Sequence, residues 1–456
     1  MKPNIVLITV DCWRGDHIGV ADTPKTATPH LDALAQQSHY FSNAFTCGGW
    51  TKIAMTSLVS STHASMHGFT QGKMNAERPN LAEELKENGY YTAGFTTNLV
   101  CGKSGGFERG FDLFDEPRPP LPKGRQLNRN KKFERFASHP ITGPILSKLA
   151  PSVLPFYPTV DADDLVSTAI DWLNEEREQP YFLWLHFMDL HWPYRSSSRT
   201  VDAQEYTQMW QDRTHWQKVK NAHGKYYPGD TRAERWKQLY AEETQTLDNA
   251  LGRLFTSLNR RDDWHNTALC VTSDHAEELY ENGTWAHSWN QLRKEGTHVP
   301  LLLKLPKQTK AVKETRTVSQ LDIAPTLLAI AGADCPKKML GEDLLSPNED
   351  APVISEMLGH SGSHKYRLSI RHNGYHYLYD GDHNRCELYK GSSTSNIYSL
   401  NCPTSKQFDS LRLRHVSEGA LDMLKGDVVI GEDEISYDLD DDPAVIERLR
   451  ALGYMD

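Results

Sequence analysis

Two short apolar runs, far apart in the chain, each lead directly into residues that can bind a metal ion. Ile5–Val10 is followed by Asp11, and Leu269–Ser273 is followed by Asp274 and His275. Short runs without polar alternation are typical of strands buried on both faces, as in parallel sheets. Because open α/β sheets bind ligands at the carboxyl ends of their strands, the two runs predict such a sheet, with a functional site at these side chains.

Further strand and helix patterns alternate along the chain, which favours βα units around a mostly parallel sheet. Asn80–Asn88 is one predicted helix, with Asn80 as a suitable N-cap and Gly89 as a stop. The other predicted helices are Thr28–Ser38, Lys52–Ser60 and Leu239–Leu258, and the predicted strands are Ile5–Val10, Tyr91–Thr96, Tyr181–His186, Ala268–Ser273 and Pro300–Leu305.

The sequence predicts two parts of unequal size. Residues 1–345 form the α/β part, interrupted by polar or proline-rich insertions at about 116–160 and 196–235, which we expect to line the substrate site. Residues 346–456 form a smaller α+β subdomain with an antiparallel sheet. Asn373-Gly374 between two strand-like segments is typical of a two-residue hairpin turn.

Charge and apolar content limit the possible partners and locations. The net charge of −10 argues against broad nucleic-acid binding, which needs a basic surface. No stretch approaches the roughly 20 apolar residues of a membrane span, and the N-terminal run does not resemble a signal peptide. The seven cysteines include no Cys-x-x-Cys pair. We therefore expect reduced thiols and a cytoplasmic location.

Asp11, Asp274 and His275 are candidate metal ligands. Carboxylate oxygen together with imidazole suits Zn, Mn or Fe. The alternative for Asp11 is that it only caps the turn after its strand. For Asp274 and His275, the position at the end of a strand is a stronger argument than the dipeptide itself.

Thr51 is the candidate nucleophile. A divalent cation lowers the pKa of a coordinated hydroxyl and makes its alkoxide accessible. A hydroxyl at a helix N-terminus would also hold an anionic substrate against backbone N–H groups. The alternative is that Thr51 only caps the helix Lys52–Ser60.

Taken together, these segments resemble the sulfatase-like branch of the alkaline phosphatase superfamily. The resemblance covers most of the chain, and its motifs follow the order of that family. They are Asn4–Arg14, Thr28–Ala35, Phe41–Phe45, Trp50–Gly68, Asn80–Tyr90, Gly110–Asp112, His186–Tyr194, Thr272–Leu279, Thr297–Leu303 and Ser319–Leu328. The resemblance implies an alkaline-phosphatase-like sheet flanked by helices, and one divalent metal ion, either Mn, Zn, Ca or Mg.

Departures from the family pattern bear on the activity. Sulfatases of this family carry Cys-x-Pro-x-Arg, whose cysteine becomes formylglycine, whereas here Thr51 occupies that position and Cys47 lies four residues earlier. Threonine there resembles phosphodiesterases and phosphoglycerol transferases. A single Asp11 before Trp13-Arg14 resembles phosphonate monoester hydrolases. The resemblance therefore implies a hydrolase or transferase of phosphate-type esters. A sulfatase and an inactive anion-binding relative are the alternatives.

The resemblance also implies roles for further polar residues. His191 and His287 are expected to act on the leaving group or a non-bridging oxygen of a small anionic ester. Lys52, Asn98 and Arg14 are expected to contact the substrate, although Lys52 could point outward, Asn98 could serve only a turn, and Arg14 could instead anchor the metal loop through a carboxylate. A homo-oligomer is possible.

Two conspicuous features receive no role. We expect Glu277, Glu278 and Glu281 to be solvated on an exposed helix. Cys12 could ligate a soft metal, but a buried, inert thiol is the favoured interpretation.

Overall fold

The computed structural model describes most of the chain, with gaps. It describes residues 2–68, 73–118, 160–177, 180–194, 208–209, 211–212, 215–216, 230–281, 283, 285–287, 292–346, 351–358, 366–391, 395–399 and 402–424, the last eight of these as backbone alone. The two predicted insertions, 116–160 and 196–235, therefore lie mostly outside the described residues. The prediction that they line the substrate site concerns these same residues and stays a prediction.

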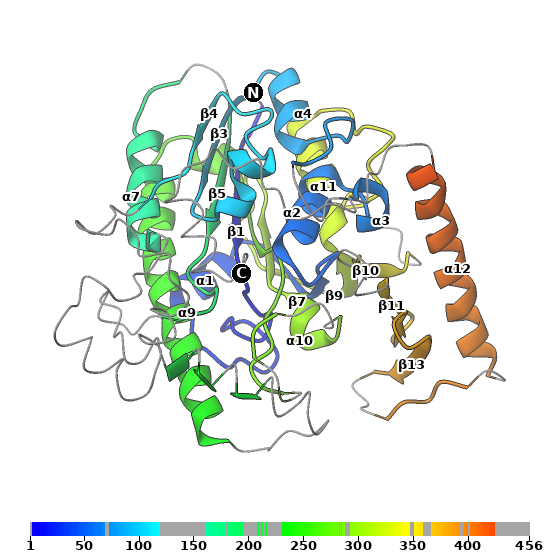
Figure 1. The fold of residues 1–456 in the computed structure, drawn as a ribbon. Helices are drawn as coiled ribbons and strands as arrows, with labels where there is room; N and C mark the ends of the chain where they lie inside the picture. The colour runs from blue at the N-terminus through cyan, green and yellow to red at the C-terminus, as the bar shows by residue number, and fades with distance from the viewer. Residues whose placement is uncertain are drawn as a thin grey trace, which may run out of the picture.

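A nine-stranded sheet forms the centre of the molecule (Figure 1). Its order is β4-β3-β5-β1-β6-β8-β2-β7, with β9 also paired to β2. The first five strands in this order run parallel, whereas β8 is antiparallel to both of its neighbours. The strands are β1 Asn4–Val10, β2 His39–Phe45, β3 Tyr91–Thr96, β4 Leu113–Asp115, β5 Tyr181–Phe187, β6 Thr267–Ser273, β7 His298–Val299, β8 Leu301–Lys304 and β9 Val312–Ser319.

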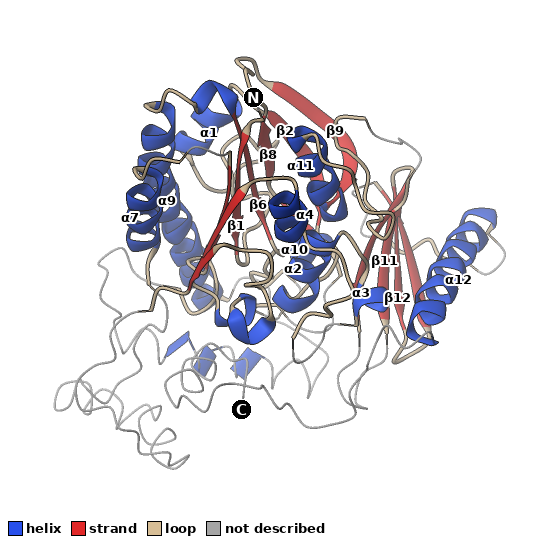
Figure 2. Cartoon of the chain, turned by 90° about the horizontal axis from the view of Figure 1, so that it is seen from above, coloured by secondary structure: helices blue, strands red, loops and turns tan. Residues whose placement is uncertain are grey.

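Helices cover both faces of this sheet (Figure 2). On one face lie α1 Pro29–Ala35, α7 Ala162–Leu173 and α9 Thr231–Asn259; on the other lie α2 Thr51–Ser60, α4 Leu81–Glu87 and α11 Ile323–Ala331. Strand β1 shows why two layers are needed. Val6, Ile8 and Val10 pack into the first core, whereas the alternate residues Ile5 and Leu7 pack into the second. This confirms the predicted α/β fold.

The remaining helical segments are short. They are α3 Ala64–His67 and α10 Lys294–Thr297, together with the 3₁₀ turns Leu99–Cys101, Lys103–Gly105, Trp264–Asn266 and Gln320–Asp322. The predicted cap of α4 is confirmed, because Asn80 accepts a hydrogen bond from the Ala82 N–H at 2.9 Å. Gly89 has a φ of 80°, which suits glycine just past the end of a helix. Helix α9 begins at Thr231, eight residues before the predicted start.

The C-terminal part contains a small antiparallel sheet, as predicted, and the structure shows that it has four strands and is covered by a helix. The elements are β10 Val353–Met357, β11 Arg367–His372, β12 Tyr375–Asp380, β13 Arg385–Lys390 and α12 Pro403–Leu424. Asn373 and Gly374 join β11 to β12 with φ values of 50° and 74°, as a tight hairpin turn requires. Phe408 of α12 packs on Tyr377 of this sheet, with the two rings stacked 5.8 Å apart.

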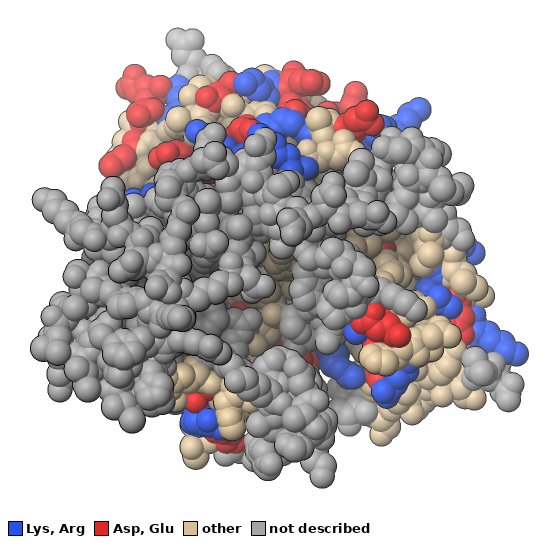
Figure 3. All heavy atoms as spheres, in the orientation of Figure 1, with Lys and Arg blue, Asp and Glu red and all other residues tan. Residues whose placement is uncertain are grey.

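The described residues show the distribution of surface charge, the state of the cysteines and the apolar content of the helices. Acidic and basic side chains are interspersed on the described part of the face drawn in Figure 3. All seven cysteines are free thiols. Within the described part of the chain, no helix has both the length and the apolar content needed to cross a membrane.

Candidate active site

The carboxyl ends of β1 and β6 bring Asp11 and Asp274 to the same edge of the sheet. The two strands are parallel neighbours, with Val10 opposite Ser273, so the residue after each strand lies at the same level. A backbone N–H of this edge also joins the two loops, since Cys12 N donates to Asp274 Oδ1 at 3.1 Å. Both carboxylates are fully buried. The strand register therefore explains how residues 263 positions apart meet.

His275 directs one ring nitrogen toward these carboxylates. Its Nδ1 lies 2.9 Å from the Ala276 carbonyl, which can only accept, so Nδ1 carries the proton in the neutral ring and Nε2 carries the lone pair. Nε2 lies 3.5 Å from Asp274 Oδ2 and 3.7 Å from Asp11 Oδ1. Backbone orientation of a ring in this way is typical of metal-binding histidines.

The three side chains fit a divalent cation. Asp11, Asp274 and His275 each offer a ligand atom, and these atoms lie within 4.8 Å of one another. Asp274 Oδ2 is buried and has no hydrogen-bond partner among the described residues. A buried, unsatisfied carboxylate oxygen is costly, and a cation would offset that cost. This supports the predicted ligand set.

Thr51 completes the cluster at the first position of α2. Its Oγ1 lies 3.2 Å from His275 Nε2 and 3.4 Å from Asp11 Oδ2, and the residue is fully buried. The alternative that Thr51 caps a helix starting at Lys52 is wrong. The helix begins at Thr51 itself, and its N-cap is Trp50, whose side chain forms no capping bond.

Burial and like charge make this cluster electrostatically demanding. Burial, and then the charge of Asp274, raise the pKa of Asp11 to about 8. Burial alone would lower the pKa of His275, but the charges of Asp274 and Asp11 outweigh it and raise that pKa. The folded protein therefore favours positive charge between these groups, which a divalent cation supplies.

Asn98 contacts the cluster, and Lys52 follows Thr51 in α2. Asn98 Nδ2 donates to Asp11 Oδ2 at 2.7 Å, and its Oδ1 accepts from the Val100 N–H at 2.8 Å. Lys52 is only 2% exposed, so the expectation that it could point outward is wrong. Burial lowers the pKa of Lys52 to about 8. Contact of either residue with substrate stays a prediction.

Arg14 pairs with carboxylates, one of its two predicted roles. Its guanidinium lies 2.8 Å from Asp16 and 2.7 Å from Glu281, and Nη1 donates to the Glu277 carbonyl at 3.0 Å. These contacts hold the loop after β1 against the loop after β6. The alternative prediction, contact of Arg14 with the substrate, is not tested by these contacts.

His287 lies next to His275, and His191 lies next to His287. The ring centroid of His287 is 4.7 Å from that of His275 and 5.2 Å from that of His191. His191 Nδ1 lies 2.5 Å from the Trp192 carbonyl, and burial together with His287 lowers the pKa of His191 to about 3. His287 Nδ1 lies 3.3 Å from Glu277 Oε1. The structure therefore brings together all three histidines named from the sequence.

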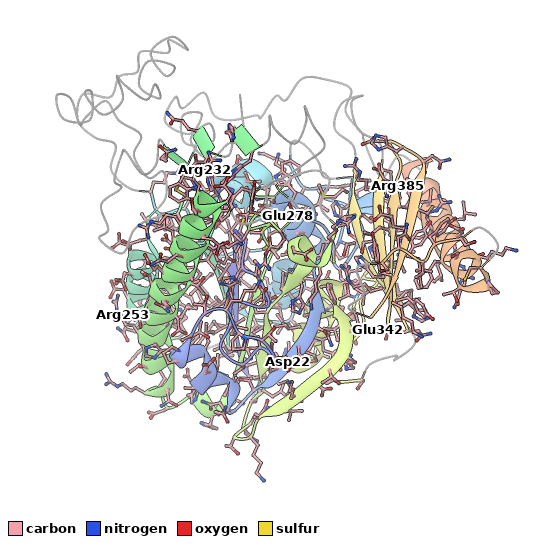
Figure 4. All side chains as sticks on the ribbon, turned by 90° about the horizontal axis from the view of Figure 1, so that it is seen from below. Asp22, Arg232, Arg253, Glu278, Glu342 and Arg385 are labelled. Atoms are coloured by element: carbon pink, nitrogen blue, oxygen red, sulfur yellow. The ribbon has the colours of Figure 1, made fainter. Side chains whose placement is uncertain are left out.

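The carboxylates after His275 contradict the sequence-based expectation. Glu277 and Glu278 are at most 1% exposed, and residues 276–278 form no helix. The chain turns back on itself here, since Leu279 bridges Trp285 and the Ala286 N–H donates to the Glu278 carbonyl. Figure 4 shows Glu278 near the middle of the molecule, whereas Arg253 and Arg385 lie toward its two sides.

Glu281 was also expected to be solvated, but it is partly buried and pairs with Arg14. The sequence carried one usable signal for this group of carboxylates. They follow directly on a strand end that already holds two candidate ligands.

Cys12 lies closer to the site than its predicted inert role suggested. Its φ is 62°, a region that few residues other than glycine adopt and that is often found at functional sites. The thiol lies 3.0 Å from Asp11 Oδ1 and 3.5 Å from His287 Nδ1. Burial and the neighbouring carboxylates raise the pKa of Cys12, so the neutral thiol is favoured in the folded chain.

Comparison with known protein families gives two matches. The model described as "Sulfatase" matches residues 3–333, about three quarters of the chain. A second, described as "N-sulphoglucosamine sulphohydrolase, C-terminal", matches residues 285–384. The first match includes every residue of the candidate site.

Individual relatives differ in their named activities. An ulvan-active sulfatase from Formosa agariphila is 26% identical over 78% of this chain and 67% of its own length. A multifunctional alkaline phosphatase superfamily protein from Trinickia caryophylli is 23% identical over 75% of this chain and 76% of its own. Among solved structures, a phosphonate monoester hydrolase from Silicibacter pomeroyi superposes with a TM-score of 0.67 at 17% identity, covering 92% of this chain and 96% of its own. The structural likeness supports the fold.

Proposed function

Because this chain belongs to the sulfatase family, we propose that it is a metal-dependent hydrolase of phosphate-type esters with the Thr51 hydroxyl as nucleophile. One observation carries the proposal: Thr51 Oγ1 lies 3.2 Å from His275 Nε2 and 3.4 Å from Asp11 Oδ2. A phosphoryl group can be transferred to and from a threonine oxygen, whereas sulfatases of this family depend on a formylglycine that threonine cannot form. The substrate is a small anionic ester.

Asp11, Asp274, His275 and Thr51 would hold the metal ion. A divalent cation there supplies two things: a lower pKa for a neighbouring hydroxyl, and positive charge opposite the ester oxygens. The imidazole in the set favours Mn²⁺ or Zn²⁺ over Ca²⁺ or Mg²⁺, which prefer oxygen ligands throughout. Asn98 would orient Asp11 through its 2.7 Å hydrogen bond.

In the first step, the Thr51 hydroxyl loses its proton to solvent, and Oγ1 forms a bond to phosphorus while the bond from phosphorus to the leaving alcohol breaks. His287 is better suited than His191 to protonate that alcohol. Its Nδ1 lies 3.3 Å from Glu277 Oε1, so this carboxyl group can orient the ring. His191 already directs Nδ1–H to the Trp192 carbonyl and is held neutral by burial, so its Nε2 can only accept.

In the second step, water attacks phosphorus, the bond to Thr51 Oγ1 breaks, and the hydroxyl is restored. An acceptor alcohol in place of water would make the protein a transferase, as the threonine also allows. Burial of Lys52 beside Thr51 suits a contact with a negatively charged ester.

A second candidate function is hydrolysis of sulfate esters. The names of the relatives favour it, since an ulvan-active sulfatase is among them. The position of Cys47 speaks against it. That thiol is buried and lies 3.9 Å from Ser319 Oγ, and burial raises its pKa above the usual range of a cysteine, which disfavours a reactive thiolate.

Location and assembly also stay proposals. Seven free thiols suit a reducing compartment, so we propose a cytoplasmic location. Homo-oligomer formation is likewise a prediction, which sedimentation or light scattering of the purified chain would check.

A substrate panel with parallel metal analysis tests the proposed function. Aryl sulfate, phosphate monoester, phosphodiester and phosphonate monoester substrates would be compared for the wild type and for Thr51→Ala. We expect turnover of a phosphorus ester by the wild type, and its loss in Thr51→Ala with metal retained. Thr56→Ala is the matched control, because this buried hydroxyl on the same helix forms no hydrogen bond within the described chain.

Three results would contradict parts of this account. Undiminished turnover by Thr51→Ala with metal retained would remove Thr51 as the nucleophile. Preference for the aryl sulfate would establish the second candidate. Metal binding without turnover of any substrate would indicate a relative that only binds an anion.

A further inference from the structure

A second group of metal-ligating side chains lies between the α/β part of the chain, called the catalytic part because it carries the proposed active site, and the C-terminal sheet. His63 precedes α3, Glu356 lies in β10, and His415 lies on α12. Each offers a ligand atom, and these atoms lie within 4.8 Å of one another. Helix α12 packs against α3 at this point. None of the three residues belongs to the Asp11 cluster.

Glu356 is held at the centre of the group. His415 Nε2 lies 2.6 Å from Glu356 Oε1, which also accepts from the Tyr366 hydroxyl at 2.6 Å. The other oxygen, Oε2, accepts from the Ser65 N–H at 2.8 Å. Glu356 is fully buried and His415 is 5% exposed. The carboxylate therefore has a fixed orientation, as a ligand in a preformed site needs.

His63 is the third member of the group, and it lies outside the hydrogen bond between Glu356 and His415. Its ring lies 4.6 Å from that of His415 and nearly perpendicular to it. Its Nδ1 is buried and has no hydrogen-bond partner among the described residues. Burial, and then His415, lower the pKa of His63 to about 4, so the ring is neutral, the form in which imidazole binds metals. A neutral imidazole thus lies beside an oriented carboxylate and a second imidazole.

We propose that His63, Glu356 and His415 bind a second divalent transition-metal ion, of the Zn²⁺ type, that fastens α12 and β10 to the catalytic part. Two imidazoles and one carboxylate are a common three-ligand set for zinc, with a fourth position for water. On binding, the proton between His415 Nε2 and Glu356 leaves to solvent, and the nitrogen lone pair binds the ion. Zinc affinity of this site should therefore fall as the pH is lowered.

The position of the ligands gives the ion a structural role. The first half of α12 already packs on the C-terminal sheet, where Asp409 accepts from the hydroxyls of Tyr377 and Tyr398. His415, six residues further along the helix, reaches the catalytic part. An ion at this point links segments that are about 350 residues apart in sequence, so its loss should loosen α12 first.

Zinc stoichiometry separates the two sites. The full chain and its variants would be loaded with zinc, dialysed against metal-free buffer and measured by elemental analysis. We expect two equivalents in the wild type, one in Asp274→Asn, one in His415→Ala, and none in the double variant. His383→Ala is the matched control and should keep two, because His383 is an exposed histidine of the C-terminal hairpin.

A second measurement covers the case in which His415→Ala does not fold. Cobalt would replace zinc in Asp274→Asn, which keeps only the proposed site. Visible absorption of tetrahedral Co²⁺ is expected there, and it should be lost in Asp274→Asn combined with His63→Gln. One zinc equivalent in the wild type and none in Asp274→Asn, or a Co²⁺ spectrum unchanged by His63→Gln, would overturn the proposal. Because these readouts are metal content and spectra, they stand whether or not Thr51 is the nucleophile.

Discussion

Two clusters of imidazole and carboxylate groups in the described part of the protein, the proposed active site and the proposed second metal site, differ in what surrounds the ligands. The first, at Asp11, Asp274 and His275, lies at the carboxyl edge of neighbouring parallel strands, with the Thr51 hydroxyl against it. In the second, at Glu356, the nearby Tyr366 hydroxyl donates its proton to the carboxylate and so only holds it in place. Ligand type alone therefore does not separate the proposed catalytic site from the proposed structural one. The two clusters differ in the role that the neighbouring hydroxyl can take.

The largest expected difference is in turnover. Asp274→Asn should lower kcat/KM on the order of 10³-fold or more, because a catalytic cation contributes several kcal/mol of transition-state stabilisation. His415→Ala should change it by less than about twofold, since its cluster holds no reacting group. Steady-state kinetics of both variants on the best panel substrate checks this. Equal losses in the two would break the distinction between the clusters.

His287→Ala should show the next largest effect. Loss of a general acid costs about 10²–10⁴-fold, and the cost should grow as the leaving alcohol becomes more basic. A series of aryl and alkyl esters measures this dependence. A loss that is the same for every leaving group would assign His287 to binding instead, and a larger dependence in His191→Ala would exchange the two roles.

Asn98→Ser should have a smaller effect, on metal affinity. Serine can still accept from the Val100 N–H but cannot donate to Asp11 as Asn98 does at 2.7 Å. Weakening of metal binding by about 10–100-fold is expected for loss of such a partner. Competition with a chelating dye measures it. Asn80→Ser, at the N-cap of α4, is the matched control and should bind metal as the wild type does.

The smallest expected effect is on the pH dependence of stability, in the second cluster. Burial raises the pKa of Glu356, but the charge and hydrogen bond of His415 outweigh it and hold that pKa below its usual range. A depressed folded-state pKa stabilises the fold above the unfolded pKa, about 4.3, and this contribution is lost as the pH falls below it. Urea unfolding of the chelated chain between about pH 5 and pH 3 should therefore show a steeper loss in the wild type than in His415→Ala. Equal slopes would mean that the pair does not stabilise the fold.

Much of the catalytic part could be predicted because its signals are local. Apolar runs gave the central strands, and the residue after each strand gave Asp11 and Asp274. The cap at Asn80 and the turn at Asn373 follow from side-chain chemistry that acts within a few residues.

Other features depend on contacts between distant segments. Strand β9 has a polar sequence and lies beside β2, and its partner cannot be inferred from its own residues. The burial of Lys52 and Glu277 depends on which loops cover them. The second cluster needs α12, a helix without a clear apolar pattern, to return to α3. Sequence patterns indicate periodicity and position along the chain. They do not show which distant segments pack against each other in the fold.

The covalent state of Thr51 during turnover tests the central claim most directly. Samples quenched in acid during steady-state hydrolysis of a phosphorus ester would be digested and mapped by mass spectrometry. The account predicts that the peptide containing Thr51 carries the phosphoryl part of the substrate, and that His287→Ala and His415→Ala carry it at the same residue. A phosphoryl group on another side chain, in an enzyme that turns over while Thr51 stays unmodified, would contradict it.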